Sequence, residues 1–336
     1  MAVARRSHAG LRRQSTGIAL ISAGAFALAT CCAHPQTPAA QPQAAPQTRF
    51  YYYKTPESDL DAFVHAVPAT DADRLTALRN AFTKVDCTGD RLRTEPVDEK
   101  HDAGAQNLIC TWPSASPDSI VVVAHYTRHG KGDSALDDWS GAALLPALCL
   151  AMQVQARRNQ WIFLESAGGR GDAAFLKSLP ASAKAHIRAV IALDALGLDP
   201  RLRFFTPSDN QDPSLGEIHL EMEVLVASLL DRGISQPQLI DPGRWLDTDD
   251  TQPFRYAHIP VILLHSVPPK QGDVPDSKKD LPSVIDANAY DENYRAIAVF
   301  MVALDRDAAM LNVADDKFWN SGPGYRLNLD DLPHLH

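Results

Sequence analysis

The feature that most constrains the fold is a set of four short, unbroken runs of apolar residues, separated by helical or polar stretches. The runs are SIVVVAHY (119–126), QWIFLES (160–166), RAVIALDAL (188–196) and IPVILLHS (259–266). Strands buried on both faces of a parallel sheet have this continuous apolar character, whereas half-exposed strands alternate apolar and polar residues. Strands alternating with helices predict an α/β domain, a three-layer sandwich with a mostly parallel central sheet and helices on both faces.

Polar side chains stand at the ends of these runs. His125 lies at the carboxyl end of the first run, Glu165 at that of the second, and Asp194 near the end of the third, while Asp137 opens the turn that follows the first. The carboxyl ends of parallel strands line the ligand crevice of an open α/β sheet, so we expect these four side chains on one rim. A single acid or histidine at a strand end is more often solvated than functional. Four that converge favour a functional site.

Three carboxylates and an imidazole in one crevice need positive charge, because like charges raise each other's pKa and disfavour the ionised forms. A divalent cation supplies that charge, and a shell of His and Asp suits zinc or another borderline metal. Glu165, on a separate strand, would act as a general base toward water, which predicts hydrolysis. The neighbouring His129, Asp133 and Asp138 are interpreted as solvated loop residues.

The amino terminus is interpreted as a targeting signal. Four arginines and no acid precede an apolar run over 17–30 that is too short to favour a membrane span, so we expect a secretory signal peptide over 1–30. The sequence around Cys31 is similar to a bacterial lipoprotein processing site, and an ordinary cleaved signal is the alternative. We therefore expect an exported protein, periplasmic or held on the outer membrane, whose only membrane contact is a lipid on Cys31.

The rest of the chain is expected to be a tether, one domain and a tail. Residues 31–49 are rich in Pro, Gln and Ala without apolar periodicity and predict an extended tether. The α/β domain is expected over 50–310 and a C-terminal tail over 311–336. The formal net charge of the chain is −9, and removal of the arginine-bearing signal makes the remainder more acidic. This balance argues against nucleic acid as a partner.

Three cysteines lie within the expected domain. In an oxidising compartment Cys87 and Cys110 could pair, since they flank a segment that could return on itself as a hairpin, and this pairing stays open. The third is Cys149. Because no Cys-x-x-Cys motif occurs, a thiolate metal site is not expected.

Five segments resemble, in order and spacing, the motifs of the zinc-dependent aminopeptidase family that includes bacterial leucyl aminopeptidases and glutaminyl cyclases. The segments are VVVAHYT, ALDDWSGAALL, IFLESAGGRGDAAFL, VIALDALGL and TDDTQPFRYAHIPVILLHS. The resemblance covers roughly residues 58–304, and the last two segments are closer to the cyclases. It implies the phosphorylase/hydrolase-like sandwich of the zinc exopeptidases, in agreement with the strand pattern.

The resemblance implies a role for each of four intact positions. His125, Asp137 and Asp194 match metal ligands, Asp137 being the one that bridges two zinc ions in the two-zinc members of the family. Glu165 matches the catalytic base. One complete metal site is therefore expected.

Other family positions are replaced. Ser166 and Thr251 stand where the family has a Glu and a His ligand, and Thr127 stands where it has an acid that orients the imidazole of His125. A hydroxyl is a weak, neutral zinc ligand, so the second metal should be lost. We expect one zinc ion per chain, or none if the site has degenerated.

Three functions stay open. The first is a divergent metal-dependent hydrolase, an exopeptidase on small peptides. The second is a catalytically degenerate, peptidase-like binding protein in which Arg128 or Arg170 neutralises the acids. The third is a glutaminyl-cyclase-like acyltransferase, although the cyclases use the site lost here. Retention of Glu165 favours the first slightly. A peptide or small-molecule substrate is the expected partner, and the oligomeric state is left open.

Overall fold

The computed structural model describes residues 52–98, 102–154, 157–205, 234–235, 237–239 and 252–311. The predicted signal peptide, the tether, the tail after residue 311 and Thr251 lie outside these ranges. Within them, none of the helices combines the length and the apolar character needed to cross a membrane.

An eight-stranded sheet forms the centre of the domain, in the order β1-β2-β4-β3-β5-β8-β6-β7. The strands are β1 (Leu92–Asp98), β2 (Asp102–Trp112), β3 (Ser119–His125), β4 (Gln160–Ser166), β5 (Ile187–Leu193), β6 (Arg203–Phe205), β7 (Gln238–Leu239) and β8 (Val261–His265). The four apolar runs form β4, β3, β5 and β8, which lie side by side and parallel. The antiparallel pairs lie toward the edges, at β1–β2, β2–β4 and β6–β8.

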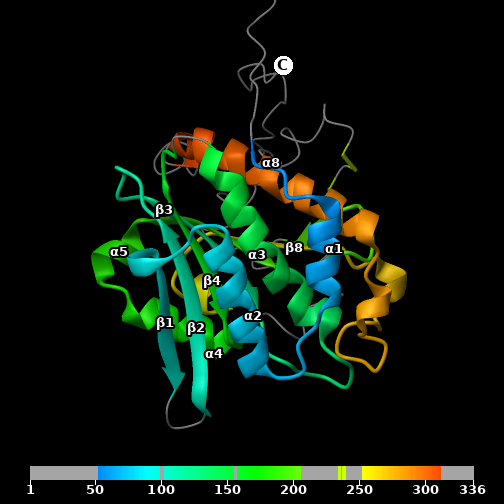
Figure 1. The fold of residues 1–336 in the computed structure, drawn as a ribbon. Coiled ribbons are helices and arrows are strands. Elements are labelled where there is room, and N and C mark those ends of the chain that lie inside the picture. Colours follow the sequence, from blue (N-terminus) through cyan, green and yellow to red (C-terminus); the bar gives the residue numbers. More distant parts are fainter. Residues whose placement is uncertain are drawn as a thin grey trace, which may run out of the picture. The chain divides into compact units, whose positions relative to one another are not determined.

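Helices connect the strands and cover the sheet, as Figure 1 shows. They are α1 (Glu57–His65), α2 (Asp71–Lys84), α3 (Ser140–Ala151), α4 (Gly168–Ser178), α5 (Ala181–Ala185), α7 (Gln252–Tyr256) and α8 (Ala287–Leu311). Short helical turns are η1 (Gly89–Arg91), η2 (Ala135–Trp139), η3 (Met152–Val154), η5 (Pro269–Gln271) and η6 (Pro282–Val284).

The two faces of the sheet have separate cores. Along β3, Val122 packs into the cluster that contains apolar residues of α1, α2, α3 and α8. The adjacent Val123 points to the other face, where Phe175 of α4 and Phe254 of α7 pack. Successive side chains of a strand point to opposite faces of the sheet, so every second residue of β3 packs against the same layer of helices. The predicted three-layer α/β sandwich is therefore confirmed.

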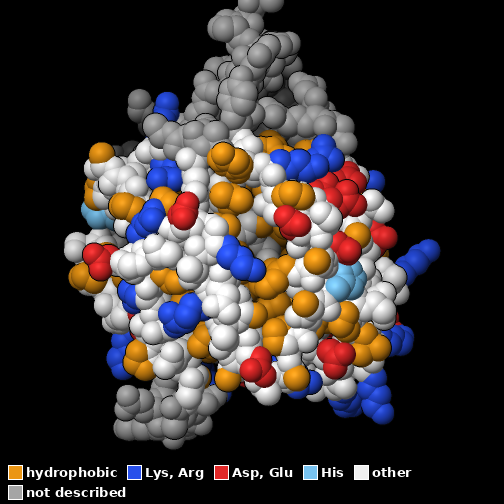
Figure 2. All heavy atoms as spheres, viewed as in Figure 1, with side chains coloured by type: hydrophobic (Ala, Val, Ile, Leu, Met, Phe, Trp, Pro, Cys, Tyr) orange, Lys and Arg blue, Asp and Glu red, His pale blue; other side chains and the backbone are white. Residues whose placement is uncertain are grey.

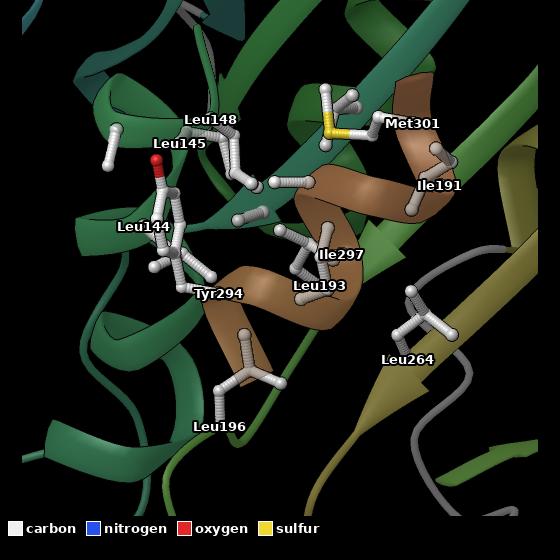
Figure 3. Packing of buried hydrophobic residues seen from close by; sticks show 14 of the residues in the cluster. Leu144, Leu145, Leu148, Ile191, Leu193, Leu196, Leu264, Tyr294, Ile297 and Met301 are labelled. Carbon is white, nitrogen blue, oxygen red and sulfur yellow. The ribbon is translucent and has the colours of Figure 1, made fainter. Parts of the chain in front are cut away.

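The larger core joins two helices that are distant in sequence. Leu144, Leu145 and Leu148 of α3 lie close to Ile297 and Met301 of α8, with β5 residues packed against α8 (Figure 3). These side chains are fully buried, and each such burial contributes about 1.5–3 kcal/mol. This packing fixes α3, whose amino end adjoins the polar turn η2.

Cys87 and Cys110 form a disulfide with a Cα–Cα distance of 6.2 Å, so the pairing left open by the sequence is made. It joins the chain after α2 to β2. Cys149 is buried and free, and burial raises the pKa of its thiol to about 12.

Charge on the surface is mixed. Lys and Arg side chains are interspersed with acidic and apolar ones over the face seen in Figure 2.

Candidate metal centre

The loop between β3 and η2 is held in place by Arg74 of α2. The Arg74 side chain is fully buried and donates hydrogen bonds to the main-chain oxygens of Tyr126 (3.1 Å), Ser134 (3.0 Å) and Asp133 (2.5 Å). Burial lowers the pKa of Arg74 to about 10, which leaves it charged at neutral pH. One cation therefore ties both ends of the loop to α2.

Asp280 fixes the turn η2 from the other side. Its Oδ1 accepts a hydrogen bond from the backbone N–H of Leu136 (2.6 Å), and its Oδ2 accepts one from Asp137 (3.2 Å). Its main-chain oxygen also accepts a bond from the N–H of Asp133. Asp280 thus sets the backbone that presents the pair Asp137 and Asp138.

Two groups of candidate ligands meet at this turn. In the part of the chain that the structure describes, ligand atoms of Asp137, Asp138 and Asp194 lie within 4.8 Å of one another, and so do those of His129, Asp137 and Asp276. Asp137 belongs to both groups. The structure therefore brings together two of the predicted ligands, Asp137 from η2 and Asp194 from the end of β5.

His129 contacts three of these acids. Its Nε2 lies 2.9 Å from Oδ1 of Asp276 and 3.5 Å from Oδ1 of Asp137, and its Nδ1 lies 3.2 Å from Oδ2 of Asp138. Hydrogen bonds to Asp137 and Asp138 raise the pKa of His129 to about 12, so the imidazole is protonated when no metal competes for it.

Two loop residues were misassigned by the sequence pattern. The interpretation of Asp138 as solvated is wrong, because it is 4% exposed. The side chain of His129 is 37% exposed, but its contacts make it part of the cluster rather than a free loop residue. Asp133 is exposed, as expected.

The two adjacent carboxyls of η2 have opposite pKa shifts. Burial raises the pKa of Asp138 to about 7. Burial also opposes ionisation of Asp137, but the hydrogen bond with His129 outweighs it and the pKa of Asp137 is lowered. Among the described residues, these two acids together with Asp194, Asp276 and Asp280 outnumber His129 and Arg74, the cations that lie beside them. A net negative cluster of carboxylates and an imidazole fits a borderline divalent cation such as zinc.

His125 lies outside both groups. Its Nε2 is 3.0 Å from Oδ2 of Asp172, a buried acid of α4 on the same side of the sheet as Val123. A zinc-binding histidine usually donates a hydrogen bond from its other ring nitrogen to a carboxylate or a main-chain carbonyl. Asp172 can thus serve His125 as the orienting acid that is missing at Thr127. Ligation by His125 stays a prediction.

Glu165 points to the opposite face of the sheet from His125. It pairs in register with Ala124, and its charge contributes, after burial, to the raised pKa of Tyr290 in α8. Glu165 is fully buried, and neither carboxyl oxygen has a hydrogen-bond partner among the described residues. Burial raises the pKa of Glu165 well above its ordinary value. Such a group costs stability, so its presence calls for a functional explanation.

The remaining candidates have other partners or lie on the surface. The hydroxyl of Ser166 donates to the main-chain oxygen of Gly168 at 2.9 Å. Arg128 and Arg170, the candidate neutralising residues, are exposed, and Arg128 donates to the main-chain oxygen of Ala69. Within the described part of the chain, His129 rather than either arginine is the cationic group that contacts the acids of η2.

Comparison with known proteins gives matches at the level of family and fold. Peptidase family M28 matches residues 107–301. Leupeptin-inactivating enzyme 1 of Streptomyces exfoliatus is 28% identical over 174 residues, which cover 49% of this chain and 36% of that protein. The chain therefore spans about a third of the length of this curated relative.

Solved structures with the same fold include cyclases and an aminopeptidase. The glutaminyl cyclase of Macrostomum lignano has a TM-score of 0.60 at 15% identity, covering 74% of this chain and 88% of that one. The Porphyromonas gingivalis glutaminyl cyclase gives 0.57 at 17% identity, covering 75% and 99%. The Legionella pneumophila LapA aminopeptidase gives 0.56 at 14% identity, covering 77% and 78%. At these identities the similarity shows a shared fold.

Proposed function

The chain belongs to peptidase family M28, and on this premise we propose that it is a zinc-dependent hydrolase of peptide bonds, an exopeptidase acting on small peptides. The observation that carries the proposal is the meeting of Asp137 and Asp194 with further acids and a histidine where β3 and β5 end. The signal expected over 1–30 would place this reaction outside the cytoplasm, with no nucleic acid involved.

We assign His125, Asp137 and Asp194 to one zinc ion, with Asp172 orienting His125. When bound, zinc would polarise the scissile carbonyl and offset the negative charge that develops on its oxygen. The assignment is supported by the closeness of Asp137 to Asp194 and by the buried contact of His125 with Asp172. It requires the ring of His125 to approach the two acids.

We assign the role of general base to Glu165. Its carboxylate would take a proton from the attacking water and return it to the leaving amine. A carboxylate whose pKa is raised by burial is a stronger base than an exposed one, which favours the transfer of a proton from water. Glu165 lies one residue before the end of β4, in register beside Ala124 of β3, close to the strand end that leads to Asp137.

One observation favours a second function, a catalytically degenerate binding protein. A protonated His129 already contacts three acids, so the cluster has a counter-charge without a metal. In that case the zinc-free protein would keep its full stability, since no ligand would be lost from the folded state.

The test is zinc content together with hydrolysis by the purified protein. We expect zinc that falls by about one ion per chain in His125→Ala and in Asp194→Ala, and cleavage of small peptides with a free amino terminus but not of their acetylated forms. Absence of zinc with an unchanged melting temperature would support the binding protein instead. Conversion of glutaminyl peptides to pyroglutamyl ones without hydrolysis would support a cyclase.

A further inference from the structure

We propose that His129, Asp137 and Asp276 form a second divalent-cation site, distinct from the site of His125 and Asp194. The two sites share only Asp137. The inference therefore rests on the proposed function only in the role that this function gives to Asp137. The family pattern would build a second site on Asp137 with side chains that are here Ser166 and Thr251. In the proposed site, Asp137 would bind a second cation together with His129 and Asp276 instead.

The distances suit zinc. Two ligand atoms that are each about 2.1 Å from a tetrahedrally coordinated zinc ion lie about 3.4 Å apart. Nε2 of His129 lies 2.9 Å from Asp276 and 3.5 Å from Asp137, and the three ligand atoms lie within 4.8 Å of one another. A cation could enter with small side-chain shifts, displacing the proton of Nε2.

His129 also has the support that a zinc-binding histidine needs. Its Nδ1 lies 3.2 Å from Oδ2 of the buried Asp138, which leaves Nε2 directed at Asp137 and Asp276. An acid on the far nitrogen fixes the ring and its tautomer. The pair of His129 and Asp138 thus parallels the pair of His125 and Asp172.

The backbone is built to bring His129 and Asp276 together. Gly130 has φ +71°, and a Cβ there would lie 2.8 Å from the Cα of Asp276, closer than real Cβ contacts allow. A Cβ at Gly132 would likewise clash with the main-chain oxygens of Ser277 and Asp280. Asp276 itself has φ +58°, a conformation that Asp tolerates better than most residues. Glycine is therefore required where the loop meets the segment that bears Asp276.

The acids at this point exceed the nearby positive charge. Asp137 and Asp138 are buried, and Asp276 extends the cluster to the surface, so a cation could enter from solvent. Imidazole with carboxylates is a donor set that binds zinc rather than calcium or magnesium, which prefer oxygen ligands alone. Zinc is therefore the probe of choice.

The experiment measures zinc per chain in the purified protein by elemental analysis, after stripping with a chelator, reloading with Zn²⁺ and dialysis. The variants are His129→Ala and Asp276→Asn for the new site, and His125→Ala for the first site. Asp273→Asn is the matched control, because Asp273 is an exposed acid of the same segment that pairs with Lys279. Circular dichroism checks folding, and visible absorption of the Co²⁺-loaded protein reports loss of an imidazole ligand.

We expect two zinc ions in the parent and in Asp273→Asn, and one in each of the other three variants. A parent with one ion that is lost in His129→Ala and Asp276→Asn but kept in His125→Ala would uphold this site and overturn the first. One ion that survives in both His129→Ala and Asp276→Asn would overturn this site alone. An equal loss in Asp273→Asn would mean non-specific binding by surface acids, and a parent without zinc would overturn both sites.

Discussion

Nε2 of His125 lies 3.0 Å from Oδ2 of Asp172, and both side chains are buried. His125 ends β3 and Asp172 belongs to α4, so the contact joins the central sheet to one of its covering layers. A buried carboxylate of this kind can hold an imidazole in one orientation and tautomer.

Asp172→Asn tests whether this contact supports a metal ligand. An amide is a neutral and weaker partner for the imidazole, so we expect zinc at the His125 site to bind about 10–100-fold more weakly. Competition with a chromogenic chelator measures the affinity. Asp118→Asn is the matched control, since Asp118 lies 2.9 Å from His186 in a more exposed pair. Equal affinities in the parent and in Asp172→Asn would contradict the orienting role.

Replacement of Glu165 separates catalysis from stability. In Glu165→Gln we expect a fall in peptide hydrolysis of about 10²–10⁴-fold, the range for loss of a general base, with unchanged zinc content. In Glu165→Leu we expect the same loss of activity and a higher melting temperature, because an apolar group replaces a buried carboxyl that has no hydrogen-bond partner among the described residues. Activity that survives in Glu165→Gln would refute the mechanism.

Glu165 also predicts how stability depends on pH in the zinc-free protein. The pKa of Glu165 is raised in the folded state, so the folded protein binds this proton more tightly than the unfolded chain does. The resulting contribution to the free energy of unfolding is fully present below the ordinary pKa of Glu and is lost as pH rises through the raised value. Asp138, with a pKa of about 7, acts in the same direction. Each group can lower the free energy of unfolding by up to about 1.4 kcal/mol for each unit of rising pH.

Urea unfolding of the zinc-free parent and of Glu165→Gln between pH 5 and 8 measures this effect. The free energy of unfolding of the parent should fall relative to that of the variant as pH rises, because Gln does not ionise. Parallel curves for the two proteins would show that Glu165 does not titrate in this range.

The sheet could be predicted from the sequence because an unbroken apolar run directly marks a strand covered on both faces. The runs predicted over 119–126, 160–166 and 259–266 differ from β3, β4 and β8 by no more than a few residues at each end. The strand-end rule likewise placed Asp137 near Asp194. Both features depend on local pattern and on a general rule of α/β topology.

His129 could not be placed in this way. Its position depends on Arg74, which binds the loop from α2, and on Gly130, which permits close approach to Asp276, far along the chain. The two loop glycines were the available signal, but they do not identify which segment approaches them. Similarly, the separation of His125 from Glu165 follows from strand register, since His125 pairs with Ser166 and not with Glu165.

Arg74 should be needed for both stability and the new cation site. In Arg74→Ala the buried main-chain oxygens of Tyr126 and Ser134 lose their donor, and each such loss costs about 1–3 kcal/mol, so we expect the free energy of unfolding to fall by about 3 kcal/mol or more. Zinc should be lost at His129, because the loop is no longer held toward Asp276. Arg74→Lys should not restore either property, since a single ammonium cannot span carbonyls at both ends of the loop. Arg79→Ala, a partly exposed change on the same helix, is the control, and equal stability of Arg74→Ala and Arg79→Ala would rule out the role given to Arg74.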